Sequence, residues 1–407
     1  MSGIKVKGFF QDITGVNRIV KSREESFREA SSENRQTDPI RVLADAIHPD
    51  KQVFTVTKVY EASPTARTFR FEPDNGHIAP FQCGQYANFY LTIGSSRVTR
   101  AYSISSAPFQ ALGEKPFFEI TIRRKRPYFV PDWFFENVKE GSKITSALPF
   151  SQFFYEPLRD SDHLMALAGG SGITPFASMA KEIAYESTHD DAPYHTLKNV
   201  DLTILYGSVK HTDIVCGDQI EEARKQAPDR IHVVHVMSDD SEWEGEKGFV
   251  TKEIMEKYSV PDMTYFFCGP LPMFNMVKKN LSDMGVPEKR FRHDAIAQPA
   301  SVKFIPGFPE DQTGRTYQLT VMRGIRKDVI PAKADEPVAV ALERAAIPVD
   351  THCRAGECGF CRSQLLSGSI FVSPLGDGRR KMDREMGWFH ACSSYPTSDL
   401  TIKIPII

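Results

Sequence analysis

The feature that most constrains this chain is a group of cysteines near its C-terminal end. Four of the seven cysteines lie within the last 55 residues: Cys353, Cys358, Cys361 and Cys392. Three of them share the short segment CRAGECGFC, and the fourth follows after thirty further residues. A loop that brings three thiols together and is closed by a distant fourth suits a compact, thiol-held metal group.

The spacing distinguishes between two kinds of metal group. Structural zinc sites usually present two short Cys or Cys/His pairs, whereas this chain has one close pair, a cysteine five residues upstream and a lone distant one. The pattern C-x4-C-x2-C followed by a remote cysteine is the plant-type spacing of [2Fe–2S] ligands. Gly356 and Gly359 would let the backbone pass close to the sulfides. We therefore predict an iron–sulfur cluster, with zinc as the alternative.

Composition excludes several other classes of protein. The 407 residues carry 50 Lys and Arg against 52 Asp and Glu, which excludes an overall cationic nucleic-acid binder and an acidic disordered chain. No apolar stretch approaches the length of a transmembrane helix, and the N-terminal sequence MSGIKVKGFFQD lacks the apolar core of a secretory signal. An odd cysteine count argues against a disulfide framework. We expect a cytoplasmic protein without a membrane span or a nucleic-acid partner.

Changes of residue pattern predict a multidomain chain. Residues 1–50 are polar and predict a surface extension with a short helix near residues 39–46. Short runs rich in β-branched and aromatic residues predict an antiparallel β-barrel over residues 51–157. Apolar runs then alternate with helical segments over residues 158–297, which predicts an α/β domain with a parallel sheet. A linker over residues 298–315 would lead to a compact α+β unit, residues 316–407.

The segment Arg100-Ala101-Tyr102-Ser103 follows a strand-like run in the predicted barrel. Its chemistry suits a flavin, because an aromatic ring offers a stacking face, a hydroxyl can reach the ring edge near N5, and a guanidinium can bind phosphate. The alternative is an ordinary barrel strand with an exposed arginine.

The segment GGSGITP, residues 169–175, lies between the apolar run HLMALA and a helical segment. Glycines at a strand-to-helix turn let the phosphates of a ligand approach the backbone and the helix N-terminus. The segment lacks the G-x-G-x-x-G pattern, so a standard Rossmann dehydrogenase is not predicted. The alternative is a tight turn, but three glycines in four positions exceed what a turn needs.

The segment CGPLPM, residues 268–273, ends a second strand-like run and opens another helical segment. Ligands bind at such carboxyl ends of parallel strands, although Cys268 alone is equally suited to a small buried position. In this order and spacing the three segments resemble the ferredoxin–NADP reductase superfamily. Residues 316–407 resemble a plant-type ferredoxin domain, whose fold is a β-grasp. The domain order is similar to that of the phthalate dioxygenase reductase and phenylacetyl-CoA oxygenase reductase type, and to hybrid-cluster-protein reductases.

The resemblance implies roles for the matched residues. Tyr102 would stack on the flavin, Ser103 would hydrogen-bond near N5, Arg100 would hold the flavin phosphate, and Cys268 would border the nicotinamide, which makes Tyr102, Ser103 and Cys268 the catalytic set. The other nucleotide contacts would come from Gly169, Gly170, Gly172, Thr174, Gly269 and Pro270. The cluster ligands would be Cys353, Cys358, Cys361 and Cys392.

Two cofactor choices remain open at this point. The resemblance favours FAD, but the stretch RPYFVPDWFFENV lacks the second phosphate segment of FAD-type members, which keeps FMN open; amides near Pro131 would have to serve instead. Ser208 and Lys210 could meet the 2′-phosphate of NADPH, but we favour NADH.

The implied function is that of an NAD(P)H-dependent oxidoreductase. It would pass electrons through a flavin to a [2Fe–2S] cluster and on to a separate acceptor protein, such as an oxygenase, a hybrid-cluster protein or another reductase component. The alternative is a structural or regulatory subunit whose four-cysteine site braces a partner interface. Arg379, Arg380, Lys381 and Arg384 would form either a solvated face, which we favour, or a docking patch for an acidic partner.

Overall fold

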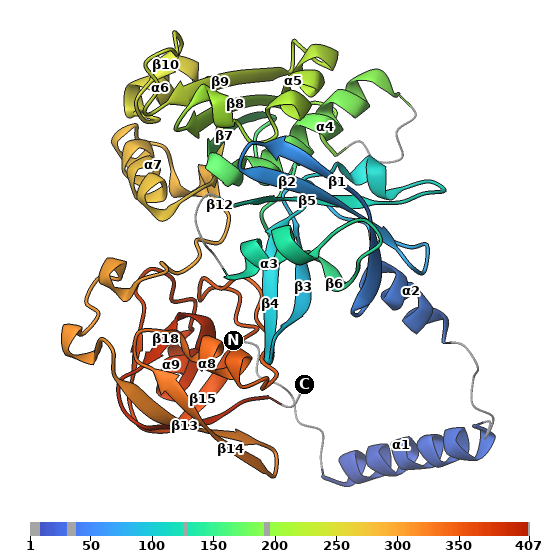
Figure 1. The fold of residues 1–407 in the computed structure, drawn as a ribbon. Coiled ribbons are helices and arrows are strands. Elements are labelled where there is room, and N and C mark those ends of the chain that lie inside the picture. The colour runs from blue at the N-terminus through green and yellow to red at the C-terminus, as the bar shows by residue number, and fades with distance from the viewer. Residues whose placement is uncertain (1–8, 31–37, 125–128, 191–195, 406–407) are drawn as a thin grey trace. The chain divides into compact units, whose positions relative to one another are not determined.

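The computed structural model describes residues 9–30, 38–124, 129–190 and 196–405 (Figure 1). They fall into two compact units, Met1–Asp45 and Ala46–Ile407. No helix among these residues is long and apolar enough to span a bilayer.

The N-terminal region contains more helix than the sequence analysis predicts. The short helix expected near residues 39–46 is α2 (Pro39–Ile47), which begins where the Asp38 carboxylate accepts a hydrogen bond from the Ile40 amide at 3.0 Å. Helix α1 (Phe9–Glu29) was not expected. Its described side chains, from Thr14 to Glu29, are all exposed. Apolar residues do recur at helical spacing in its sequence, at Phe9, Ile13, Val16 and Val20. This signal was overlooked beside the polar run that follows.

The first sheet of the larger unit is antiparallel and six-stranded, with the order β4-β3-β6-β1-β2-β5. Phe54, Phe69, Phe71, Phe89 and Phe118 fill its interior and are wholly buried. A bridge between Ile104 and Ile120 joins the end of the β4 segment to β5, so the sheet curls toward a barrel. Helix α3 (Phe129–Asn137) packs Phe134 into the same core. The strands are β1 (Gln52–Ser63), β2 (Ala66–Pro73), β3 (Tyr86–Ile93), β4 (Ser96–Ser103), β5 (Phe118–Arg123) and β6 (Lys143–Phe150).

The second sheet is parallel, with the order β10-β9-β8-β7-β11-β12. Its first strand in the chain, β7, lies between β8 and β11, so the strand order reverses there and creates the point where ligands bind in such sheets. The strands are β7 (His163–Gly169), β8 (Asp201–Ser208), β9 (Ile231–Met237), β10 (Glu246–Lys247), β11 (Thr264–Cys268) and β12 (Phe291–His293).

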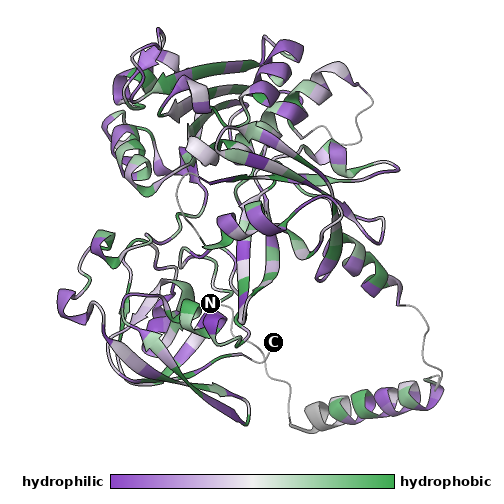
Figure 2. Cartoon of the chain, in the orientation of Figure 1, coloured by the Kyte–Doolittle hydropathy of each residue, from purple (hydrophilic) through white to green (hydrophobic). Residues whose placement is uncertain are grey.

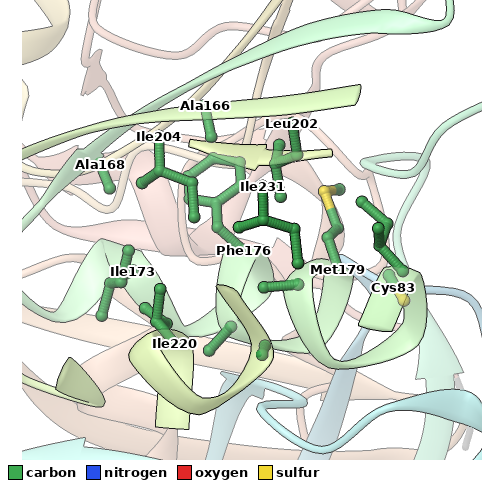
Figure 3. Close-up of a cluster of buried hydrophobic side chains, with 14 of the residues drawn as sticks. Cys83, Ala166, Ala168, Ile173, Phe176, Met179, Leu202, Ile204, Ile220 and Ile231 are labelled. Atoms are coloured by element: carbon green, nitrogen blue, oxygen red, sulfur yellow. The ribbon is translucent and has the colours of Figure 1, made fainter. Parts of the chain in front are cut away.

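Helices cover the parallel sheet and bury its apolar strands. On one face, Phe176 and Met179 of α4 and Ile220 of α5 pack against Ile204 and Ile231 of the strands (Figure 3). Figure 2 shows the contrast between these hydrophobic strands and the largely hydrophilic α5. The helices are α4 (Thr174–Thr188), α5 (Gly217–Gln226), α6 (Lys252–Tyr258) and α7 (Leu271–Asp283).

The third sheet is mixed and five-stranded, with the order β14-β13-β19-β15-β17, and α8 (Val338–Arg344) packs its apolar side on it. Its strands are β13 (Thr316–Arg323), β14 (Arg326–Lys333), β15 (Arg362–Ser367), β17 (Trp388–His390) and β19 (Leu400–Lys403); the short pair β16 (Ile370–Val372) and β18 (Ser394–Pro396) and helix α9 (Lys381–Glu385) complete this part. The predicted fold class, an antiparallel barrel-like sheet, a parallel nucleotide-type sheet and a C-terminal α+β part, is confirmed. The domain boundaries within Ala46–Ile407 stay a prediction.

The segment predicted as a linker, residues 298–315, is packed rather than free. Val302 and Ile305 are buried, and together with Phe308 they contact Tyr395 and Phe371 of the C-terminal part. Its proline and glycine content therefore marks irregular backbone, not separation.

Helix α4 carries a buried carboxylate, Glu182, between the first two sheets. Its Oε2 accepts a hydrogen bond from the Phe109 amide at 3.2 Å. Burial raises the pKa of Glu182 from 4.5 to about 7, and the nearby Glu186 raises it further against that hydrogen bond. The folded chain therefore holds this proton more tightly than the unfolded chain does.

This arrangement predicts a pH-dependent stability. Between about pH 4.5 and pH 7 the parent should lose stability relative to a variant without this carboxyl group as pH rises, because folded Glu182 binds the extra proton there. Glu182→Gln keeps an acceptor for Phe109 and removes the buried charge, so it should be roughly 1–3 kcal/mol more stable than the parent at pH 8 and equal to it at low pH. Denaturant titrations across pH measure this, with the exposed Glu114→Gln as control. The same pH dependence in parent and Glu182→Gln would contradict the assignment.

Candidate functional site

Nine of the ten residues predicted to contact flavin or nucleotide line one cavity of about 1230 Å³. Tyr102 and Ser103 reach it from the end of β4, the residues of the 169–174 turn from the end of β7, and Cys268, Gly269 and Pro270 from the end of β11. Because β7 and β11 are adjacent parallel strands, their carboxyl ends meet at one edge of the sheet. The three sequence segments are therefore brought together as predicted, while the role of each residue stays a prediction.

The glycine turn after β7 is pressed against the turn after β11. A Cβ on Gly172 would lie 2.1 Å from the Cys268 carbonyl oxygen and 2.8 Å from the Gly269 nitrogen, so no other residue fits there. Gly170 has a φ of +56°, and the Tyr206 hydroxyl donates to its carbonyl at 2.9 Å. The turn is thus free of side chains at its three glycines and is fixed in position, as a phosphate-binding turn requires.

Tyr102 is held by the aromatic core of the barrel. Its ring packs edge-on against Phe89, with centroids 5.9 Å apart, and against Phe134, with centroids 5.6 Å apart. Burial raises the pKa of its phenol. A ring fixed in this way at the cavity wall offers the flat apolar surface on which a flavin can stack.

Arg100 is the one predicted residue that does not line this cavity. Its Nη1 donates to the Thr99 carbonyl at 2.8 Å and to Glu343 Oε1 at 3.2 Å. Its assignment to the flavin phosphate stays a prediction.

Sequence reasoning missed Asp294, which follows β12. The Cys268 thiol donates to its Oδ2 at 3.7 Å, and the Ala295 amide donates to its Oδ1 at 2.8 Å. Burial raises the pKa of Asp294 to about 6, against hydrogen bonds that include one from Ser103. A buried carboxyl group therefore stands between the residue predicted near flavin N5 and the one predicted near the nicotinamide. No local residue pattern in the segment FRHDAIAQ indicates a role for Asp294. Only the fold brings Asp294 close to Cys268.

Arg123, the last residue of β5, is a second residue that the sequence analysis missed. It lines the cavity, and its Nη1 would lie 2.7 Å from a Cβ on Gly170. Its Nη2 pairs with Asp213, and its Nε donates to the Thr65 hydroxyl at 3.0 Å. A fixed cation therefore faces the glycine turn. Arg123 is the last residue of the segment FFEITIR, whose residue pattern predicts a strand but no contact with a ligand.

The cluster loop has the backbone that its sequence predicts. The amides of Ala355 and Cys358 donate to Cys353 Sγ at 3.4 and 3.5 Å, contacts that favour a thiolate. Gly356 has a φ of +87°, and a Cβ there would lie 2.2 Å from the Gly376 carbonyl oxygen. The loop therefore turns tightly against the 376–378 segment.

The four predicted ligand thiols lie next to one another in pairs. All are free, and Cys353 adjoins both Cys358 and Cys392, while Cys392 adjoins Cys361. No three His, Cys, Asp or Glu side chains among the described residues converge closely enough to hold a single ion. Four thiols with amide donors are the donor set of a [2Fe–2S] cluster, and in this sense the residues fit that group.

A second cavity, of about 820 Å³, lies between the cluster loop and the other two sheets. Cys353, Glu357 and Cys358 line it on one side, and Tyr86 and Asp294 on the other. Since Asp294 also accepts from the Cys268 thiol in the first cavity, the predicted flavin–nucleotide site and the predicted cluster site adjoin through one carboxylate.

Three of the four basic residues after the cluster loop lie near a carboxylate, and two of these three share the same one. Arg379 and Arg384 both pair with Asp377, at 2.7 and 3.3 Å, and Lys381 lies 3.8 Å from Glu385. The four basic residues outnumber these two carboxylates and leave this surface positively charged, so the choice between a solvated face and a docking patch stays a prediction.

Comparisons with known proteins agree with this geometry. Residues 166–279 match the family model of the oxidoreductase NAD-binding domain, and residues 325–397 match that of the 2Fe–2S iron–sulfur cluster binding domain. The chain belongs to the class of oxidoreductases that join these two domains.

The relatives that span most of the chain have the same class. The glycine betaine monooxygenase reductase subunit of Chromohalobacter salexigens is 27% identical over 361 residues, which cover 85% of this chain and 93% of the relative. NADH oxidoreductase HCR of Escherichia coli is 27% identical over 333 residues, covering 79% and 89%. Phthalate dioxygenase reductase has a similar fold, with a TM-score of 0.62 at 18% identity, covering 87% of this chain and 98% of that one.

The close contact at Gly172 yields a prediction. Gly172→Ala should force the two turns apart and slow reduction of the bound flavin by NADH at least tenfold, because the nucleotide's phosphates lose their backbone cradle. Reduction by dithionite should be unchanged. Gly15→Ala is the control, since a Cβ there meets nothing within 4 Å and Gly15 does not line the cavity. Equal NADH reduction in Gly172→Ala and parent would exclude the turn as the nucleotide site.

Proposed function

We propose that this chain is a reductase that moves electrons from NAD(P)H through a bound flavin to a [2Fe–2S] cluster and on to a separate acceptor protein. The single observation that carries the proposal is the position of Asp294, which adjoins Cys268 in one cavity and lines a second cavity together with Cys353 and Cys358. A route between the two sites therefore needs no large movement of the chain.

Different residues of the first cavity would bind the nucleotide and the flavin. The glycine turn and Arg123 would hold the nucleotide's phosphates, helped by the N-terminus of α4. Cys268 and Pro270 would shape the nicotinamide pocket, and Tyr102 and Ser103 would orient the flavin. Bound there, the flavin supplies the conversion of a two-electron hydride into single electrons, which a [2Fe–2S] cluster takes one at a time. Asp294 would accept hydrogen bonds from Ser103 and Cys268 at its carboxyl group and so orient both side chains.

The cofactor choices follow from the same cavity. FAD is our choice, and its second phosphate would rely on the amides near Pro131, which lines the cavity. NADH is preferred to NADPH: Ser208 lines the cavity, while Lys210 is exposed and does not.

We propose an oxygenase component as the acceptor, supported by relatives that are named as reductase components of oxygenases. A hybrid-cluster protein or another reductase component would take electrons in the same way. We propose that the protein works in the cytoplasm, supported by an odd number of cysteines that form no disulfide among the described residues, as a reducing compartment favours.

Cofactor analysis separates this function from that of a structural subunit. The purified chain should contain one flavin and about two irons and two acid-labile sulfides. Stoichiometric zinc without labile sulfide would favour the structural subunit.

A cysteine variant tests the order of the electron path. Cys358→Ser should lose the cluster and most cytochrome c reduction, yet keep NADH oxidation with ferricyanide, which takes electrons from the flavin. Cys83→Ala, which removes a buried thiol in the core between the barrel and the parallel sheet, should keep both activities and its iron. Full cytochrome c reduction by a cluster-free variant would refute the path. Loss of both activities with flavin still bound would show that the cluster also supports the flavin site.

A further inference from the structure

Glu343 of α8 is a buried carboxylate shared by two arginines. Its side chain is only 4% exposed. Arg354, from the cluster loop, donates to it through Nη1 at 2.6 Å and Nη2 at 3.2 Å. Arg100, from β4 of the barrel, donates to it through Nη1 at 3.2 Å, and the Thr99 amide donates at 3.3 Å. One carboxylate therefore ties the cluster loop to the strand of the predicted flavin segment.

The charges of this group do not balance. Two guanidinium groups face one carboxylate, so one positive charge is left over in a place from which water is largely excluded. Burial and the charge of Arg354 lower the pKa of Arg100, while Glu343 raises it. A buried excess charge is costly unless a counter-ion completes it. Arg354 also lies near the thiols of Cys361 and Cys392, which would be negatively charged as cluster ligands. The unbalanced charge therefore lies at Arg100, which can take a further anion.

Arg100 has donors left for that anion. Its Nη1 serves both the Thr99 carbonyl and Glu343, whereas its Nε and Nη2 have no hydrogen-bond partner among the residues that the structure describes. Arg100 and Tyr102 are two residues apart on β4, so their side chains leave the same face of the strand. Nε and Nη2 form the planar edge that binds phosphate in a bidentate manner.

We propose that Glu343 is a positioning residue that couples binding of the flavin phosphate to docking of the cluster loop. It orients Arg100 through Nη1 so that the opposite edge of the guanidinium can receive the phosphate. Through Arg354 it holds the cluster loop on the same strand. The inference rests on the proposed function, because it requires the flavin to lie at Arg100–Ser103.

Thermodynamic linkage makes the coupling reciprocal. If the docked cluster loop strengthens phosphate binding, then phosphate binding strengthens docking by the same factor. Bound flavin would thereby stabilise the docked position of the cluster loop. A chain without flavin would hold its cluster loop less tightly.

The test compares two probes on the full-length chain with its cluster in place and its flavin removed. FMN carries a phosphate and riboflavin does not, while their rings are the same. Glu343→Gln should weaken FMN binding about tenfold, within the range of coupled sites, and leave riboflavin binding unchanged. Glu336→Gln is the matched control: Glu336 pairs with Arg344 at 2.6 Å in the same part of the chain, and it should change neither affinity. Unchanged or tighter FMN binding in Glu343→Gln, or an equal loss for riboflavin, would overturn the proposal.

A second variant and a second readout separate this inference from the proposed function. Arg100→Gln should abolish the preference for FMN over riboflavin. If it does not, the proposed flavin site is wrong; if it does while Glu343→Gln behaves as the parent, only the coupling is wrong. In hydrogen exchange, FMN should slow exchange of the 351–358 amides in the parent more than riboflavin does, and this difference should vanish in Glu343→Gln. A difference that persists there would also overturn the coupling.

Discussion

The contact between the cluster loop and strands of the barrel determines how far apart the two predicted cofactor sites lie. It is made from three kinds of interaction that water scarcely reaches. The Asn88 amide donates to the Thr351 carbonyl at 3.2 Å, the rings of Phe150 and His352 meet edge-on with centroids 4.4 Å apart, and Glu343 binds arginines from both sides. Because these contacts are directional, they fix the orientation of the loop, which apolar contact alone would leave free to slide.

The positions of the two predicted sites suit the two kinds of electron transfer that the proposed function requires. A hydride donor must lie flat beside the flavin, which requires the backbone-walled cavity at the ends of β7 and β11. A [2Fe–2S] cluster would take up single electrons, so it does not need flat contact with the flavin and must only lie close to it. Glycines in the turn after β7 leave room at the cavity wall for the hydride donor. The cluster loop lies close by, because its Cys353 lines the same cavity as Asp294. Asp294, buried and with a pKa raised to about 6, is the group best placed to respond to charge on either side.

Local chemistry made part of this structure predictable. Cysteine spacing and the glycine turns act over a few residues, so the cluster loop and nine of the cavity residues followed from the sequence. Asp294, Arg123 and Glu343 did not, because each acts on residues distant in the chain; Glu343 and Arg100 are 243 positions apart. Helix α1 was missed for a different reason, since its apolar period over residues 9–20 is short and leads into a long polar run.

The order of electron flow is the central claim, and anaerobic rapid mixing with NADH tests it most directly. Flavin absorbance should fall first, and the paramagnetic signal of the reduced cluster should follow at a rate set by the flavin. Removing the flavin while keeping the cluster should abolish reduction of the cluster by NADH. A cluster that NADH reduces before the flavin, or in its absence, would contradict the account.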